Sequence, residues 1–176
     1  MKKKIIGISL VIILITVFTY LLFYNSDYQP DKVVELPFEV DNSKTKLIFF
    51  FGYVGCPEVC PVSLSAVGIA TREVKDDNLQ VIFFGLSDTT QTATDNFAKV
   101  FDKNFRGIKL EKNEQRNLIE SFNVFWSPER KKINREASHS PYLYFLTKIN
   151  NKWILKNVST QYPPKKEDII KLIENL

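Results

Sequence analysis

Hydrophobic positions along the chain follow two spacings, and the first predicts strands. Residues 46–53 (KLIFFFGY) and 79–86 (LQVIFFGL) are continuous apolar runs rich in aromatic and β-branched side chains. Runs of this kind are typical of strands buried on both faces of a sheet. Residues 142–146 (YLYFL) and 153–158 predict two further strands, joined by a turn at residues 150–151 (Asn-Asn).

The second spacing is helical and recurs four times. The segments that show it are 62–75, 94–101, 114–122 and 165–176. Pro61 is well placed in the first turn of the first helix, and Thr92 or Thr94 is suited to cap the second. Strand, helix, strand and helix, then a hairpin and a final helix, form an α/β pattern with early parallel crossovers and a late antiparallel pair. The thioredoxin-like fold has this order, with a central mixed sheet and flanking helices.

An uncharged apolar run, residues 5–24, follows three lysines at the N-terminus. As a helix it would be about 30 Å long, enough to cross a bilayer core, and the preceding lysines favour a cytoplasmic N-terminus. A cleaved signal peptide is the alternative, but its apolar core is typically shorter and ends at a small-residue site. We therefore expect residues 1–26 to be a single-pass anchor in the inner (cytoplasmic) membrane. Residues 27–44 would be a tether and leading segment, and residues 45–176 a periplasmic or equivalent extracytoplasmic thioredoxin-like domain.

The net charge of +4 comes mainly from that N-terminus. Of the 24 Lys and Arg residues, three are Lys2, Lys3 and Lys4, which leaves 21 basic against 20 acidic side chains. A nucleic-acid-binding domain needs a concentrated basic face. The balance gives no reason to expect nucleic acid as a partner.

The only two cysteines, Cys56 and Cys60, lie in GYVGCPEVCPVSL, between a predicted strand and a predicted helix. Open α/β sheets hold ligands at this edge, and N–H groups at a helix start lower the pKa of a cysteine. A thiolate is both the nucleophile of disulfide exchange and a soft ligand for Cu(I) or Zn(II). A purely structural disulfide is the alternative, but a five-residue loop would gain only about 2 kcal/mol, against nearly 5 for a loop of about 100 residues. We favour redox chemistry or metal binding.

His139 is the only histidine, and it directly precedes the 142–146 strand. In a thioredoxin-like sheet this strand lies beside the 46–53 strand, so His139 and the cysteine loop can converge. Two thiolates and one imidazole would form a three-coordinate soft site, well suited to Cu(I). A structural zinc site needs a fourth ligand, and Met1 is the only methionine. If His139 does not reach the cysteines, the pair is a redox pair.

The segment FFFGYVGCPEVCPVSL resembles the signature of the Sco/SenC family, membrane-anchored thioredoxin-like proteins with a C-x-x-x-C-P motif and a distant histidine. The resemblance covers roughly residues 45–176, and FNVFW at 122–126 is similar to the family's aromatic stretch. It implies a copper chaperone, holding Cu(I), with Cu(II) as the second form, through Cys56, Cys60 and His139. It also implies a role at the binuclear copper site of cytochrome c oxidase, with a copper-accepting oxidase subunit or another copper chaperone as partner. Some members are thiol–disulfide oxidoreductases, in which case Cys56 and Cys60 would be a catalytic redox pair.

Two departures from the family pattern concern the site. The family usually has aspartate before its histidine, and Ser138 stands there in this chain. Water or backbone would then have to orient the imidazole. The family's acidic segment after the second strand is compressed to residues 85–90, where Asp88 is the only carboxylate. Ser140-Pro141 occupies the place of the cis-proline of thioredoxin-like reductases, and a cis bond there would favour thiol chemistry.

A third function, a redox- or copper-sensing membrane protein, stays open beside the chaperone and the oxidoreductase. It would use the charged loop 127–138 (SPERKKINREAS) to engage a partner. The charge and the lack of periodicity of this segment favour an ordinary solvent-exposed loop. The alternative is that Arg130, Lys131, Lys132 and Arg135 dock an acidic partner near the site.

Overall fold

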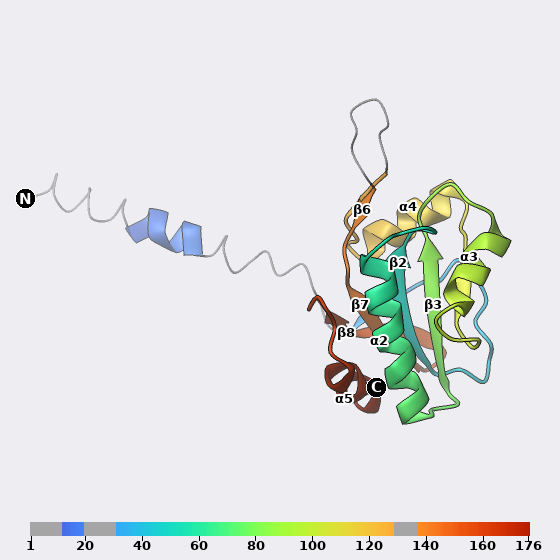
Figure 1. Cartoon of the computed structure of the whole chain (residues 1–176). Helices are drawn as coiled ribbons and strands as arrows, with labels where there is room; N and C mark the ends of the chain where they lie inside the picture. Colours follow the sequence, from blue (N-terminus) through green and yellow to red (C-terminus); the bar gives the residue numbers. More distant parts are fainter. Residues whose placement is uncertain (1–11, 20–30, 129–136) are drawn as a thin grey trace, which may run out of the picture.

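A six-stranded mixed sheet organises the protein, seen in a computed structural model that describes residues 12–19, 31–128 and 137–176 (Figure 1). The strand order is β1-β8-β7-β2-β3-β4, with β2, β3 and β4 parallel and the pairs β2·β7, β7·β8 and β8·β1 antiparallel. The bounds are β1 Lys32–Val34, β2 Lys46–Gly52, β3 Leu79–Gly85, β4 Arg106–Ile108, β7 Leu143–Ile149 and β8 Lys152–Ser159. A separate two-stranded ladder joins β5 (Trp126–Ser127) to β6 (Ser138–His139).

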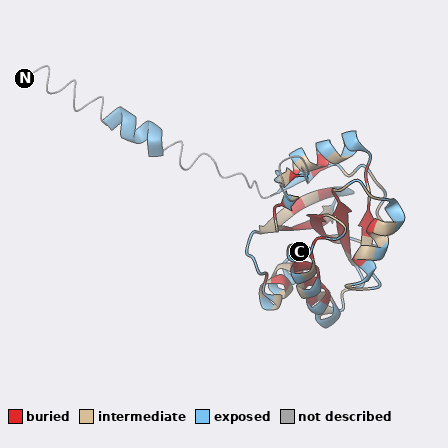
Figure 2. Cartoon of the chain, turned by 45° about the horizontal axis from the view of Figure 1, so that its top comes forward, coloured by how far each residue is buried: buried red, intermediate tan, exposed pale blue. Residues whose placement is uncertain are grey.

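Helices cover both faces of the sheet, and the cores lie between (Figure 2). They are α2 (Val59–Val74), α3 (Gln91–Lys99), α4 (Lys112–Ser121) and α5 (Lys166–Glu174). Side chains of α2, α3 and α5 pack in one apolar cluster, and Leu118 of α4 packs in the other. Alternate residues of β2 enter opposite clusters: Phe50 lies with α2, and Phe49 lies with α4. This two-sided burial explains why β2 is a continuous apolar run.

The α/β prediction is confirmed, with shifts at element boundaries. The first long helix begins at Val59, so Cys60 lies in its first turn, as Pro61 does. In α3 the cap is Thr90, whose hydroxyl accepts a hydrogen bond from the N–H of Ala93 at 3.1 Å. The expected caps Thr92 and Thr94 are therefore wrong, because the helix begins at Gln91 and both threonines lie inside it.

The hairpin turn is where the sequence places it, and the shortest strands were not predicted. Asn150 and Asn151 have φ values of +50° and +63°, the left-handed conformation that tight hairpin turns require. Strands β1, β4, β5 and β6 have two or three residues each. Segments of this length are too short to show a period in the sequence.

Most of the predicted anchor, residues 5–24, lies outside the described residues. Residues 12–19 form a helix with exposed side chains. Within the described ranges, no helix is both long and apolar enough to cross a membrane. The anchor and the boundaries at residues 26 and 44 stay predictions.

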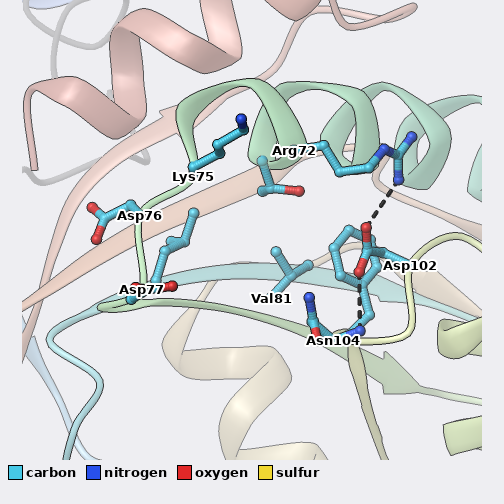
Figure 3. A pocket seen from close by; sticks show the side chains of 10 residues that line it. Arg72, Lys75, Asp76, Asp77, Val81, Asp102 and Asn104 are labelled. Carbon is cyan, nitrogen blue, oxygen red and sulfur yellow. Dashed lines mark hydrogen bonds and ion pairs between the residues drawn. The ribbon is translucent and has the colours of Figure 1, made fainter.

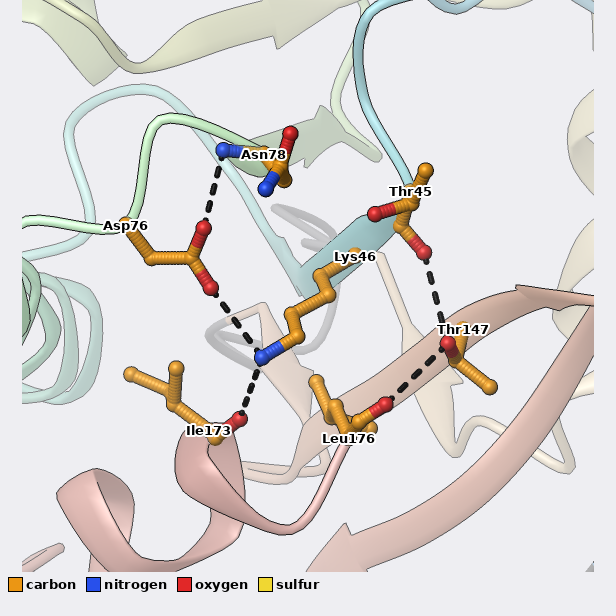
Figure 4. Close-up of polar contacts among 7 residues, drawn as sticks. All are labelled: Thr45, Lys46, Asp76, Asn78, Thr147, Ile173 and Leu176. Atoms are coloured by element: carbon orange, nitrogen blue, oxygen red, sulfur yellow. Dashed lines mark hydrogen bonds and ion pairs between the residues drawn. The ribbon is translucent and has the colours of Figure 1, made fainter.

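The start of β2, opposite the cysteine end, is tied to the C-terminal helix by a polar cluster (Figure 4). The Lys46 ammonium lies 3.0 Å from Oδ2 of Asp76 and donates to the carbonyl oxygen of Ile173 at 3.2 Å. The Thr147 hydroxyl lies 3.3 Å from the carbonyl oxygen of Leu176. Lys46 therefore places a cation at the C-terminus of α5, where the helix dipole favours positive charge, and adds a donor to a carbonyl that also accepts from the N–H of Leu176.

We expect Lys46→Met to lower the free energy of unfolding by about 1 kcal/mol, because it removes a charge-assisted hydrogen bond and leaves Asp76 without its cation. Urea unfolding followed by circular dichroism measures the change. The control is Lys99→Met, which breaks an i,i+4 pair with Asp95 and should cost only about 0.3–0.5 kcal/mol. Equal losses in the two variants would contradict a special role for the Lys46 cluster.

Candidate metal and thiol site

The pairing of β7 with β2 carries His139 to the cysteine loop. Leu143, the first residue of β7, lies opposite Phe50 near the end of β2. Because the strands are antiparallel, residues before Leu143 continue past the end of β2, where the chain turns into the cysteine loop. His139 and the cysteines therefore meet beyond the same strand end.

The three predicted ligands form one buried group. The sulfur of Cys60 lies 3.4 Å from Nε2 of His139, and the sulfur of Cys56 lies 4.0 Å from the same nitrogen. All three donor atoms lie within 4.8 Å of one another. The residues are 6%, 0% and 8% exposed for Cys56, Cys60 and His139. No disulfide joins the two cysteines.

The spacing of these donors matches a three-coordinate ion. Metal–sulfur bonds of about 2.3 Å and metal–nitrogen bonds of about 2.0–2.1 Å, in a planar triangle, place nitrogen and sulfur about 3.8 Å apart. The observed separations of 3.4 and 4.0 Å lie on either side of this value. No fourth Cys, His or carboxylate joins the group among the described residues. Two sulfurs and one imidazole without a fourth protein ligand favour a soft ion over structural zinc.

The backbone, not a carboxylate, orients the imidazole. Nδ1 of His139 lies 2.9 Å from the carbonyl oxygen of Ser140. A carbonyl oxygen only accepts, so Nδ1 carries a proton, and Nε2 is the ring nitrogen that faces the sulfurs. The rings of Phe50 and Tyr53 each lie at 86° to the plane of the imidazole. Their centroids are 5.7 and 5.8 Å from its centroid. Ser138, in the place of the family's aspartate, is exposed.

The two thiols differ in acidity although they are close neighbours. A hydrogen bond from the Cys60 thiol and, less strongly, one from His139 lower the pKa of Cys56 to about 3, against the opposing effect of burial. The N–H of Cys60, 3.4 Å from the Cys56 sulfur, adds a further donor at the helix start. The same thiol–thiol bond, together with burial, raises the pKa of Cys60. The reduced pair therefore holds one thiolate, on Cys56, and one thiol, on Cys60.

A glycine makes room for the inner sulfur. A Cβ at Gly52 would lie 2.6 Å from the Cys60 sulfur and 2.9 Å from the Phe83 ring. Any side chain at this strand end would displace the sulfur. The sequence shows the glycine at the end of a predicted strand, but only the structure shows what occupies its space.

The aromatic segment 122–126 lies beside the histidine. Trp126 pairs with His139 in the β5·β6 ladder, and its ring centroid lies 6.0 Å from that of Tyr53. The sequence links this segment to the site only through the family resemblance. Ser140 and the ladder that holds it were missed, because a two-residue strand has no period.

Other expectations near the site have different outcomes. Asp88 is exposed and takes no part in the donor group. Ser140-Pro141 is not cis; in the described part of the chain the only cis peptide bond is Tyr162-Pro163. The support for thiol chemistry that a cis bond at Ser140-Pro141 would have given is therefore removed. The four basic residues of the 127–138 loop lie outside the described residues.

A pocket of about 540 Å³ lies at the other end of α2 from Cys60 (Figure 3). Its lining is charged, and part of it is paired: Arg72 binds Asp102 at 2.9 Å, and Asp102 also accepts from the N–H of Asn104 at 3.0 Å. Its lining includes neither the cysteines nor His139. The pocket is therefore separate from the group formed by Cys56, Cys60 and His139.

Comparison with known proteins agrees with this placement. A sequence model of the SCO1/SenC family matches residues 39–175. The chain is similar to the SCO2-like protein RP587 of Rickettsia prowazekii (strain Madrid E), with 24% identity over 108 residues, which is 57% of this chain and 53% of that protein. The match thus spans about half the length of this curated relative.

Solved structures share the fold. The chain is similar to the structure of Arabidopsis thaliana ScoI with copper bound, with a TM-score of 0.63, 17% identity and coverage of 75% of this chain and 86% of that one. It is also similar to Bradyrhizobium japonicum ScoI with copper bound, with a TM-score of 0.62, 23% identity and coverage of 75% and 85%. These likenesses show the thioredoxin-like Sco fold.

We expect Cys56 of the reduced protein to react with iodoacetamide at a rate that is nearly constant from about pH 5 to pH 8. An ordinary thiol would gain about tenfold per pH unit over that range, because only the thiolate reacts; with its pKa at about 3, Cys56 is already a thiolate. Quenched alkylation and peptide mass spectrometry measure the rates at each cysteine.

The variant Cys60→Ala serves as the comparison, since it removes the thiol that donates to Cys56. In this variant the Cys56 rate should regain a dependence on pH. A parent rate that rises tenfold per unit from pH 5 to 8 would contradict a preformed thiolate.

Proposed function

The chain belongs to the SCO1/SenC family, and we propose that it binds copper as cargo and delivers it to, or prepares, the binuclear copper site of a respiratory cytochrome c oxidase. The observation that supports this most directly is the convergence of Cys56, Cys60 and His139, whose donor atoms lie within 4.8 Å of one another. Their softness and number fit Cu(I). Similar solved structures, those of Arabidopsis thaliana and Bradyrhizobium japonicum ScoI, hold copper.

The unequal exposure of the two cysteines sets the order in which copper would be bound and released. Cys56 carries the thiolate and is 6% exposed, whereas Cys60 is fully buried against Gly52. Incoming copper would meet the Cys56 thiolate first, and the Cys60 thiol would lose its proton as its sulfur binds. An acceptor's ligand would replace the outer ligands, Cys56 or His139, before the inner one. Transfer by ligand exchange in this order never leaves the ion without a ligand.

The site would work outside the cytoplasm. Residues 1–26 would anchor the chain in the inner (cytoplasmic) membrane with the N-terminus in the cytoplasm, and the thioredoxin-like domain would face the periplasm or an equivalent space. The proposed partner is a copper-accepting oxidase subunit or another copper chaperone. In an oxidising compartment the cysteines must be kept reduced, because a disulfide offers no thiolate for copper.

We expect the reduced full chain to bind one copper ion, and Cys56→Ser or Cys60→Ser to abolish this binding at micromolar copper. His139→Ala should weaken affinity at least tenfold, because it removes one of three ligands. Copper per chain after desalting, with competition against a Cu(I) chelator, gives these values. Ser138→Ala, which changes an exposed neighbour of His139, is the control. Parent-like affinity in His139→Ala would falsify the three-ligand site.

A second candidate function is thiol–disulfide exchange on partner cysteines. The observation that favours it is the unequal pair: a thiolate on the more exposed cysteine and a buried thiol behind it are what attack and resolution of a mixed disulfide require. Here His139 would have only a minor role.

His139→Ala separates the two functions. As an oxidoreductase, the variant should keep its rate of reducing a disulfide-bonded peptide within about threefold of the parent. As a copper carrier, the variant should lose affinity for copper, whatever its rate of peptide reduction. A redox titration adds the direction of exchange, since a potential below about −300 mV makes a reductant and a poor oxidant.

A further inference from the structure

Ser140 makes an unusual set of three hydrogen bonds beside the histidine. Its N–H donates to the carbonyl oxygen of Phe125 at 3.0 Å. Its hydroxyl accepts from the N–H of Phe125 at 2.9 Å. Its carbonyl oxygen accepts from Nδ1 of His139, also at 2.9 Å. The residue is 7% exposed.

In these bonds a side-chain hydroxyl replaces a backbone carbonyl as acceptor within a strand ladder. In β5·β6 Trp126 lies opposite His139, so Phe125 and Ser140 are the next pair. A hydrogen-bonded antiparallel pair exchanges two backbone bonds, each N–H donating to the opposite carbonyl. Here one bond is regular, but in the other the Ser140 hydroxyl stands where its own carbonyl would be.

This replacement leaves the Ser140 carbonyl available to the imidazole of His139. Were the Ser140 carbonyl to pair with Phe125, it would face the neighbouring strand and its bond to Nδ1 would be lost or shared. Were the hydroxyl simply absent, the Phe125 N–H would lack its acceptor, and leaving such a group unpaired costs free energy. The hydroxyl removes this conflict.

We propose that the Ser140 side chain is a positioning group: by replacing a backbone acceptor in the ladder, it allows the Ser140 carbonyl to hold His139 as the Nδ1–H tautomer with Nε2 toward the cysteines. The inference rests on the proposed function in that it treats His139 as a copper ligand. It assigns to Ser140 the orienting task that the sequence left open once Ser138 replaced the family's aspartate.

The tautomer can be read without metal because His139 is the only histidine. Long-range ¹H–¹⁵N spectra of the reduced, metal-free full chain in detergent micelles, at about pH 9 where an ordinary imidazole is neutral, distinguish the two ring nitrogens. We expect the parent to show the Nδ1–H form. Ser140→Ala should shift the ring toward Nε2–H or a mixture, and Ser140→Thr, which keeps the hydroxyl, should restore the parent spectrum.

Ser138→Ala is the matched control, since it removes an exposed hydroxyl on the other side of His139. It should leave the tautomer unchanged. An Nε2–H parent overturns the proposal even if Ser140→Ala does not fold. So does a folded Ser140→Ala with the parent tautomer, or Ser138→Ala with the larger change.

Copper affinity provides the second readout. Loss of a group that orients a metal-bound histidine typically costs about 10–100-fold in affinity. We expect Ser140→Ala to lose about tenfold and Ser140→Thr to lose less than threefold. A parent that binds no copper would refute the proposed function but leave the tautomer result to decide the role of Ser140. A copper-binding parent with an unaffected Ser140→Ala refutes only the positioning role.

Discussion

The antiparallel pairing of β7 with β2 is the constraint on which the site depends. It sets Leu143 opposite Phe50, and so projects the residues before β7 beyond the strand end where the cysteine loop begins. The register is strongly specified because both faces of β2 are buried. A slip by one residue would exchange the side chains entering the two cores. The same packing that stabilises the sheet therefore brings together residues separated by about 80 positions in sequence.

Within this frame the two sulfurs have unequal surroundings. Cys60 belongs to α2 and its sulfur fills the space left by Gly52, so helix and strand hold it in place. Cys56 belongs to the loop and receives hydrogen bonds from the Cys60 thiol and N–H. The extra residue of C-x-x-x-C, relative to a thioredoxin pair, fits this division: one thiol is inside the helix and the other faces it from the loop.

Much of this arrangement follows from the sequence, and what does not has a physical reason. The apolar runs of β2 and β3 and the spacing of α2 are long enough to be recognised, and a lone histidine before a central strand is a visible signal. The cap of α3 was misplaced because three threonines, at 90, 92 and 94, compete for it and only tertiary packing chooses. The β5·β6 ladder and the Ser140 bonds involve so few residues that no local pattern marks them.

Copper binding and disulfide chemistry compete for the same electrons on the same atoms. Copper requires both sulfurs as thiolates, disulfide formation consumes both, and the reduced metal-free pair, with one thiolate and one thiol, lies between these states. What biases the pair toward metal is the third ligand, because an imidazole whose Nε2 already faces the sulfurs needs no rotation to bind. The bond between the His139 ring and the Ser140 carbonyl thus separates a copper site from a redox pair built of the same residues.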